Sequence, residues 1–393
     1  MEFTGAAGLE VQFPNADGVF RTFKVWESPV CHPDLTAKYP AIRTFAAKAT
    51  DGTGDVMRFD VGYKGLNAFV FATDGNIQSL VPAPVDAPST YMAYRLEDLP
   101  TDRLVASVAS CGVEESEQDF FGTTYLPSQN KTAERGGAAP VQLKKYRIAV
   151  AGKGEYTQFH GGTVPTALSA IVTAVNFIVA ITERDMSLRL ELIANNDEII
   201  FLDPATDPYT GSEAGGWMSQ NAAAINPIIG SGSYDVGHVF SVYQAGSAAG
   251  IAQLSSVCST NFKAWGCSTQ QQPVGEYFYL TAAHELGHQH SGGHTFNQCQ
   301  DDSQFTPSSS WEPGSGTTIL SYGGLCGSNN VGGDSDPYYH TGTISQFLNF
   351  IYNENGNNCG VLETTDNNPP TATILHPNGF YIPISTPFEL KGE

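Results

Sequence analysis

The chain has 393 residues, of which 41% are hydrophobic, and its 19 basic and 40 acidic side chains give a formal net charge of −21. Nucleic acids and anionic membranes are bound by cationic surfaces, so this charge balance argues against both as partners. The chain has no run of about 18 apolar residues, and therefore no membrane span is expected. No secretory signal begins at Met1, so a secreted protein would already have lost its signal peptide.

Residues 1 to about 125 favour short strands. Runs rich in β-branched and aromatic residues lie at 19–26, 56–63 and 68–73. Residues 126–145 then become polar, glycine-containing and basic, which is typical of a linker open to proteolysis. We therefore expect a β-rich N-terminal domain with its linker at 1–135.

An α/β pattern begins at Tyr146. Apolar residues between 168 and 179 recur at three- and four-residue spacing, which predicts a helix. Thr163 is a candidate N-cap of this helix, and Pro165 suits its first turn. Strands at 147–151, 188–193, 199–202 and 234–243 and a helix at 218–229 complete the alternation. We expect one domain at 136–365, and at 366–393 a linker and the start of a truncated β domain.

One short segment carries the strongest chemical signal, because four of the nine histidines lie in it. His284 and His288 are four residues apart, so on a helix both imidazoles face one metal ion. Glu285 lies beside them, directed toward the place of a metal-bound water. Gly292-Gly293 can end the helix and return the chain, so that His294 becomes a third ligand. Three neutral imidazoles and a water form an open zinc site of the catalytic kind.

The pattern His284-Glu285-x-x-His288-x-x-Ser291-x-x-His294 resembles the metzincin zinc signature. Within that group it is most similar to reprolysin (adamalysin)-like metalloproteases, especially secreted bacterial members. Residues 154–162, 235–240 and 311–320 also resemble parts of this catalytic domain. The resemblance implies an α/β metzincin-type catalytic domain with a twisted mixed sheet, long helices and a zinc helix. A β-rich prodomain would precede it.

The implied activity is that of a secreted zinc endopeptidase, with zinc bound by the three histidines. Glu285 would act as general base toward a metal-activated water and then pass the proton to the leaving amine. The N-terminal prodomain would inhibit the enzyme until it is removed by proteolysis after Arg135 or Lys144-Lys145.

Two positions depart from the family pattern. Ser291 replaces a glycine, so the turn is expected either to shift onto Gly292 or to be strained. Leu320 replaces the methionine of the turn beneath the metal, where a side chain of similar volume can form the apolar floor. Tyr322 can be a fifth ligand or an oxyanion donor. Alternatively, and as we favour, it packs in a turn with its hydroxyl on the backbone.

Several neighbouring residues have weaker signals. We expect His290 to be exposed at the end of the helix and the lone His238 to have a core or surface role. Asp334 and Asp336 are candidate calcium ligands. Substrate is expected to bind as an extended strand along residues 246–254, although this segment can also be a simple loop.

Seven cysteines suit an oxidising compartment, and the alternative is a set of reduced core thiols. Their odd number leaves one unpaired. Cys111 is the candidate latency switch, because a thiolate can occupy the fourth zinc position. Alternatively, Cys111 pairs with Cys31 or is a buried thiol. Neighbours in sequence suggest the pairs Cys258–Cys267 and Cys299–Cys326, which leaves Cys359 without an obvious partner.

Three functions compete on this evidence. The first is the secreted zinc endopeptidase, and the second is a non-catalytic adhesion or binding module that kept the zinc fold. The third is a zinc hydrolase whose third ligand is a distant glutamate. Glu285 favours the first, since a binding module does not need it, and His294 argues against the third.

Overall fold

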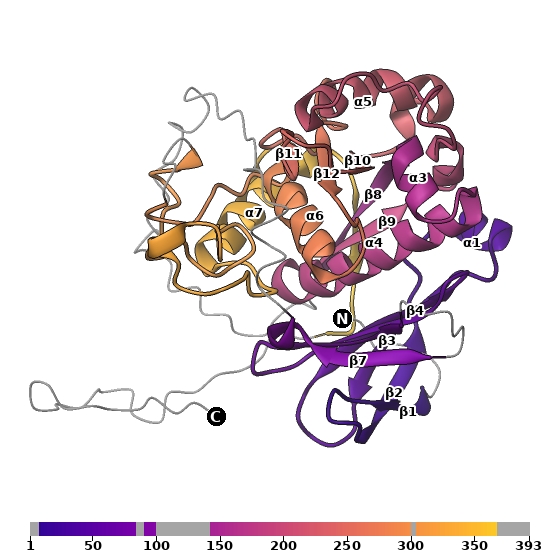
Figure 1. Ribbon diagram of the computed structural model, residues 1–393, viewed down its shortest axis with the longest axis vertical. Helices are drawn as coiled ribbons and strands as arrows, with labels where there is room; N and C mark the ends of the chain where they lie inside the picture. Colours follow the sequence, from indigo (N-terminus) through magenta and orange to yellow (C-terminus); the bar gives the residue numbers. More distant parts are fainter. Residues whose placement is uncertain (1–7, 84–89, 100–141, 300–303, 368–393) are drawn as a thin grey trace, which may run out of the picture.

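The computed structural model describes residues 8–83, 90–99, 142–299 and 304–367. Two sheets and a set of helices make up this part of the chain (Figure 1). The candidate switch Cys111, most of the predicted linker at 126–145 and nearly all of residues 366–393 lie outside the described residues.

The N-terminal region is a seven-stranded antiparallel sheet in which the strands follow one another in chain order. Its strands are β1 (Leu9–Pro14), β2 (Phe20–Glu27), β3 (Arg43–Ala49), β4 (Val56–Gly62), β5 (Gly65–Phe71), β6 (Ile77–Pro82) and β7 (Tyr91–Arg95). The short helix α1 (Pro33–Lys38) connects β2 and β3. The three predicted strands are β2, β4 and β5 with slightly shifted ends, and the β-rich N-terminal region is confirmed.

The two faces of this sheet have different partners, because side chains alternate along a strand. In β4, Met57 and Phe59 belong to a small core on the outer side of the sheet. Arg58 and Asp60 point the other way, toward the second half of the molecule, and are buried there by helix α4 (Val164–Met186).

The second sheet is mixed and has the strand order β11-β12-β10-β8-β13, with β9 paired to β8. Its strands are β8 (Gln142–Gly152), β9 (Leu188–Leu192), β10 (Val236–Val242), β11 (Gly250–Ala252), β12 (Gly266–Gln270) and β13 (Val361–Thr364). β8 runs parallel to β9 and β10, and β10 runs parallel to β12. β11 and β13 pair antiparallel with their neighbours. β11 is the first strand in the order and therefore forms one edge of the sheet.

The predicted strand at 199–202 is wrong. Residues Asn196–Ile199 form a 3-10 helix, and Ile200 makes only an isolated bridge to Gly152. The buried Asn196 side chain explains this, because its amide binds both the N–H and the carbonyl of Val150, at 2.8 and 3.0 Å. The Asn196 side chain thus makes the hydrogen bonds to β8 that a further strand was expected to make.

Helices lie against both faces of the mixed sheet. They are α3 (Gly154–Phe159), α4, α5 (Ala214–Ile229), α6 (Glu276–Gln289) and α7 (Thr341–Asn353). Single 3-10 turns occur at Leu96–Asp98, Ser231–Ser233, Gly327–Asn329 and Asn355–Asn358. The N-cap of α4 is Thr163, as predicted, and its hydroxyl accepts from the N–H of Thr166.

Helix α4 is long and apolar enough to cross a membrane by length and composition, but most of it is buried inside the protein. It lies between the two sheets, and apolar side chains cover nearly its whole circumference, as in the central helix of a core.

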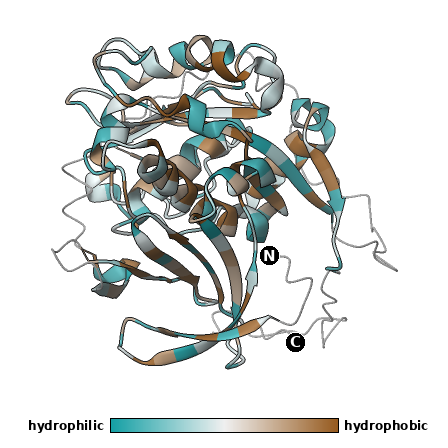
Figure 2. Cartoon of the chain, turned by 90° about the vertical axis from the view of Figure 1, so that its right-hand side faces the viewer, coloured by the Kyte–Doolittle hydropathy of each residue, from teal (hydrophilic) through white to brown (hydrophobic). Residues whose placement is uncertain are grey.

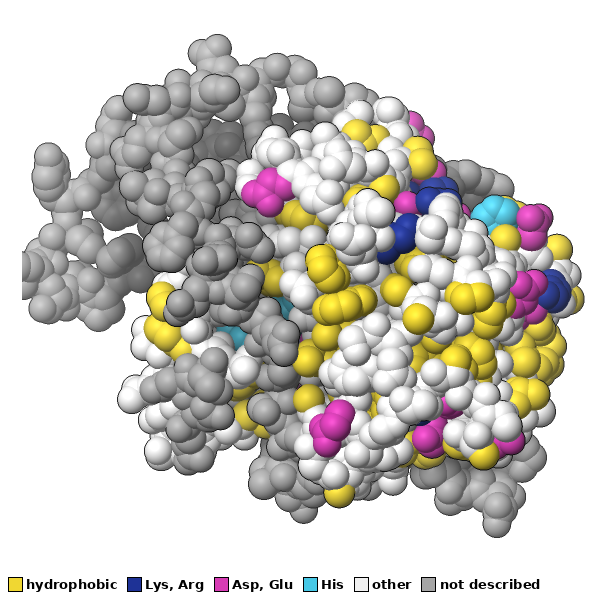
Figure 3. Space-filling model, turned by 90° about the horizontal axis from the view of Figure 1, so that it is seen from above, with side chains coloured by type: hydrophobic (Ala, Val, Ile, Leu, Met, Phe, Trp, Pro, Cys, Tyr) yellow, Lys and Arg dark blue, Asp and Glu magenta, His cyan; other side chains and the backbone are white. Residues whose placement is uncertain are grey.

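Figure 2 shows hydrophobic residues concentrated where the helices meet the sheets. The face over α5 has only scattered charged side chains (Figure 3).

Two disulfides connect the described segments, Cys258–Cys359 and Cys299–Cys326. The second pair was predicted, whereas the pair Cys258–Cys267 is wrong. Cys267 lies in β12 and is a free thiol, fully buried in the core beneath α5, where Cys258 does not reach it. Cys31 is also a free buried thiol.

Asp60 is a buried titratable group that faces α4, between the two sheets. One of its carboxylate oxygens accepts hydrogen bonds from the Thr173 hydroxyl and the Asn67 amide, both at 3.1 Å. Burial nevertheless raises the pKa of Asp60 to about 7, because those two hydrogen bonds only partly offset the loss of water.

Asp60→Asn tests this burial, since an amide oxygen can accept the same two hydrogen bonds. The folded pKa lies above the unfolded value of about 3.9, so the wild type should lose stability as pH rises from about 4 to about 7. The variant should not, and its advantage in Tm should widen over that window and then level off. A difference in Tm that stays constant with pH would contradict the assignment.

Candidate metal centre

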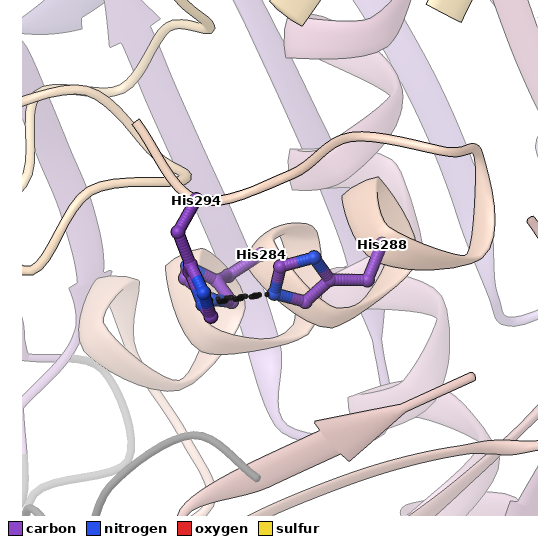
Figure 4. Close-up of side chains that lie close together, drawn as sticks. All are labelled: His284, His288 and His294. Atoms are coloured by element: carbon purple, nitrogen blue, oxygen red, sulfur yellow. Dashed lines mark hydrogen bonds between the residues drawn. The ribbon is translucent and has the colours of Figure 1, made fainter. Parts of the chain in front are cut away.

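Helix α6 carries two of the three clustered histidines. His284 and His288 are one turn apart on the same face, and Glu285 lies beside His284. The chain turns back after the helix and brings His294 to the other two rings (Figure 4). All four side chains are buried. Within the described residues, these histidines are the one group of three or more His, Cys, Asp or Glu that could hold a metal ion.

The three Nε2 atoms converge on one point. His284 Nε2 lies 3.0 Å from His288 Nε2 and 3.2 Å from His294 Nε2, and the third separation is 3.2 Å. The geometry predicted from the spacing of the motif is therefore present in the structure.

Each ring is oriented through its other nitrogen. His284 Nδ1 lies 2.7 Å from the carbonyl oxygen of Ile319. His288 Nδ1 lies 2.7 Å from the carbonyl of Gly292, and His294 Nδ1 lies 2.9 Å from that of Gln304. A carbonyl only accepts, so each Nδ1 carries the proton and each Nε2 presents a lone pair. The three Nε2 lone pairs repel one another at this distance. A cation bound between them would remove the repulsion, because each lone pair would then point at a positive charge.

Burial also keeps the imidazoles neutral. It lowers the pKa of His284 to about 4. The pKa values of His288 and His294 are lowered well below the usual value, by burial first and by the neighbouring histidines second. Neutral imidazole is the form that binds metals.

The turn after α6 does not place its left-handed residue at Gly292, which was one of the two expectations. Ser291 itself adopts the left-handed conformation, with φ of 78°. Its N–H bonds the carbonyl of His288 at 2.8 Å, and the N–H of Gly292 bonds that of Gly287 at 3.0 Å, as in a Schellman helix end. The shift of the turn onto Gly292 is therefore wrong, and the conformation that favours glycine falls on the serine.

Gly292 and Gly293 serve close packing instead. A Cβ on Gly292 would lie 2.4 Å from Leu320 Cδ1, and a Cβ on Gly293 would lie 2.6 Å from the hydroxyl of Ser309. Leu320 is fully buried and also touches Gly287 of the helix, so it lies directly under the turn that carries His288.

Tyr322 lies beside the histidine rings. Its ring centroid is 4.9 Å from that of His294, and it stacks on Phe296 at 4.6 Å. It also contributes to the wall of an open cleft that contains His284 and Glu285. This position is compatible with a fifth ligand, with an oxyanion donor and with packing in a turn, and all three roles stay predictions.

The edge strand β11 forms another wall of this cleft. A Cβ on Gly250 would lie 2.2 Å from Glu285 Oε1 and 2.6 Å from Glu285 Cδ, so only glycine allows the strand to pass this close to the carboxylate. The predicted segment at 246–254 is thus partly a strand, and it lies next to the candidate general base.

The prediction that His290 is exposed is wrong. It is buried against Tyr146 and Phe347, and its Nδ1 lies 2.7 Å from the carbonyl of Leu286. The helix end packs inward on α7, which the position of His290 after the motif did not reveal. Burial lowers the pKa of His290 to about 4.

His238 has a core role, one of the two roles expected for it. Its Nδ1 lies 3.0 Å from the side-chain oxygen of Gln289, and its Nε2 lies 2.8 Å from the Ser268 hydroxyl. Gln289, the last residue of α6, also donates to the carbonyl of Gly237 at 3.1 Å. This network attaches the end of the metal-site helix to β10 and β12.

Calcium has no support in the structure. Asp334 lies in the wall of the cleft, where burial raises its pKa to about 6, and it accepts hydrogen bonds from the N–H of Ser335 and the hydroxyl of Tyr277. Asp336 accepts from the Tyr338 hydroxyl at 2.9 Å. In the described chain these two carboxylates join no third acidic group into a cation site.

Sequence reasoning missed the role of Glu312. Its carboxylate accepts from the backbone N–H groups of Thr317 and Thr318, at 2.9 and 3.2 Å, and from the hydroxyl of Thr295. It therefore fixes the loop before Leu320 against the residue that follows His294. The one signal in the sequence is Glu312 next to Pro313-Gly314, because a glutamate that becomes buried in a tight loop must find hydrogen-bond donors.

Two substitutions test the strain at Ser291. A left-handed conformation costs an ordinary residue roughly 1–2 kcal/mol, and a β-branched one more. Both Ser291→Val and Ser291→Gly lose the hydrogen bond between the hydroxyls of Ser255 and Ser291, so the difference between the two variants measures the strain. Ser291→Val should be less stable than Ser291→Gly by about 2 kcal/mol. Thermal unfolding measures this difference, and a valine variant as stable as the glycine variant would rule the strain out.

Comparison with known proteins agrees with this site. The sequence model of the metallo-peptidase family M12B, reprolysin-like, matches residues 143–351, more than half of the chain. The search of curated proteins gives no match. Among solved structures, metalloproteinase-II from Bacteroides fragilis is similar, with a TM-score of 0.43 and 9% identity over 84% of this chain and 87% of that one. The family model, which covers more than half of the chain, shows the family. The chain belongs to the reprolysin-like metallopeptidases of family M12B.

Proposed function

We propose that this chain is a zinc-dependent endopeptidase that hydrolyses peptide bonds in proteins or peptides bound as extended strands. The convergence of His284, His288 and His294 through Nε2 carries the proposal. The proximity of Glu285 in the same cleft adds the catalytic group. A non-catalytic binding module of the same fold would have no use for that buried carboxylate.

The three histidines fit zinc in separation and in chemistry. Nitrogen ligands about 2.0–2.1 Å from a tetrahedral zinc ion lie about 3.3 Å apart, close to the observed 3.0–3.2 Å between Nε2 atoms. Three protein ligands leave a fourth position open, as in catalytic sites. A zinc ion held there supplies Lewis-acid chemistry, in that it acidifies water and polarises a carbonyl group.

Glu285 performs the proton transfers in this proposal. Its carboxylate takes a proton from the attacking water and delivers it to the nitrogen of the departing amine. The backbone of Gly250 presses against the Glu285 side chain and restricts its orientation. A general base must be held within hydrogen-bonding reach of the proton it removes, and this contact provides that restriction.

The edge of β11 is the proposed place for the substrate. One side of this strand pairs with β12, and in the described sheet no strand lies beyond its other side. A peptide added there as a further strand would gain backbone hydrogen bonds while its scissile bond passes Glu285 and the histidines. Such binding would depend on the peptide backbone, with side-chain preference set by the walls of the cleft.

Secretion and latency are part of the same proposal. The two disulfides support secretion, because disulfides persist in oxidising compartments. Latency would rest on the region before β8, with Cys111 as the candidate metal ligand, and would end on proteolysis. Of the two predicted cleavage points, Lys144-Lys145 is disfavoured, since both residues lie within β8 and Lys144 is buried. Arg135 remains the candidate.

Glu285→Gln tests the catalytic role directly. After both proteins have been cut between β7 and β8, the variant should keep its metal but cleave casein about 10²- to 10⁴-fold more slowly than the wild type, because the amide cannot take up the proton. Glu198→Gln, a change of the same kind at an exposed position, should leave activity unchanged. Casein cleavage with and without a zinc chelator, together with metal analysis of each protein, measures these effects. Wild-type turnover in Glu285→Gln would end the proposal.

A further inference from the structure

The N-terminal sheet does not cover the metal centre. The cleft that contains His284 and Glu285 is lined by residues between 249 and 335, and the sheet contributes none of that lining. The sheet instead packs along α4 and against the start of α6, and Figure 1 shows it below these helices. Its described contacts are therefore with the scaffold of the site and not with the site itself.

A buried ion pair attaches the sheet to α4. Arg58 of β4 donates to Glu183 at 2.7 Å and to the side-chain oxygen of Asn176 at 3.2 Å. Both charged side chains are almost completely buried. Burial alone would raise the pKa of Glu183, but the guanidinium groups of Arg58 and Arg189 outweigh it and lower that pKa. The carboxylate thus depends on a charge supplied by the N-terminal sheet.

A second polar contact reaches the metal-site helix. Glu276 is the first residue of α6 and is buried. Its carboxylate accepts hydrogen bonds from the hydroxyl of Ser79 in β6 and from that of Tyr94 in β7, the latter at 2.8 and 2.9 Å. The sheet therefore positions the N-terminus of the helix that carries His284 and His288.

Aromatic rings fill the space between these polar contacts. Phe69 of β5 packs edge-on against Phe177 of α4 at 5.1 Å and against Tyr279 of α6 at 5.8 Å. Phe71 contacts Phe177 at 5.4 Å. The sheet and the two helices share one continuous hydrophobic core.

The chain between β2 and α1 extends the contact to the mixed sheet. The N–H of His32 donates to the carbonyl of Leu192, and the N–H of Leu192 donates to that of Val30, both at 2.8 Å. Cys31 thereby pairs with the end of β9 as a short parallel bridge. The Tyr39 hydroxyl donates to Asp197 at 3.0 Å nearby.

We propose that the N-terminal sheet is a permanent brace of the metal-site helix and stays bound, non-covalently, after the connection between β7 and β8 is cut. Separation would expose Phe177 and Tyr279 to water and leave Glu276 without its two hydroxyl donors. Proteolysis of the connection would then leave the sheet in its place on α4 and α6. The proposal rests on the proposed function only in that the braced helix is taken to be catalytic.

The test uses the full chain, cut after it has folded. The recognition sequence of a site-specific protease replaces residues 128–135, and the purified protein is cleaved and passed over a size-exclusion column. Both fragments should elute together at the position of the uncut chain and separate only in denaturant. Elution of a free N-terminal fragment, with the other fragment folded, would overturn the proposal. Because this readout needs no activity, it is independent of whether the chain cleaves casein.

A matched pair of variants tests the contact at Glu276. Tyr94→Phe removes one charge-assisted donor and should weaken the association of the cut fragments about tenfold or more. Tyr63→Phe removes an exposed hydroxyl and should leave the association unchanged. The dissociation constants follow from dilution of the cut complexes. Equal constants for Tyr94→Phe and the wild type would show that the hydrogen bond between Tyr94 and Glu276 does not hold the sheet.

Discussion

The structure depends on three nitrogen lone pairs that face one another at about 3 Å. Three backbone carbonyls impose this arrangement, and they come from three different segments, at Ile319, Gly292 and Gln304. The chain is thus folded around a point that favours a cation. The tight turn at Ser291, the leucine floor and the loop fixed by Glu312 are the means by which those carbonyls are held in place.

Helix α6 connects the three histidines to both sheets. Its N-terminus is bound to the antiparallel sheet through Glu276, and its last residue, Gln289, is bound to β10 through Gly237 and to His238. A helix fixed at both ends keeps the histidines in register with the carbonyls that orient them. Preorganisation of this kind is what a catalytic site requires, since reacting groups must be held to within a fraction of an ångström.

The sequence predicted those features that depend on local spacing. The histidine cluster followed from the one-turn separation of His284 and His288 and from the glycine break before His294. Helix α4 followed from its apolar periodicity and from Thr163 at its start. Features decided by distant contacts were not predictable in this way. Asn196 replaced a strand with side-chain bonds to β8, and Cys258 found a partner 101 residues away. His290 was buried by α7, which no local pattern around the motif indicated.

The most direct test of the account is the metal content of the purified chain and of His294→Ala, measured by elemental analysis together with circular dichroism. The account predicts one zinc ion per wild-type chain, and loss of that ion from a variant that remains folded. A wild-type chain that is folded and takes up no stoichiometric zinc, even when zinc is supplied in excess, would contradict it.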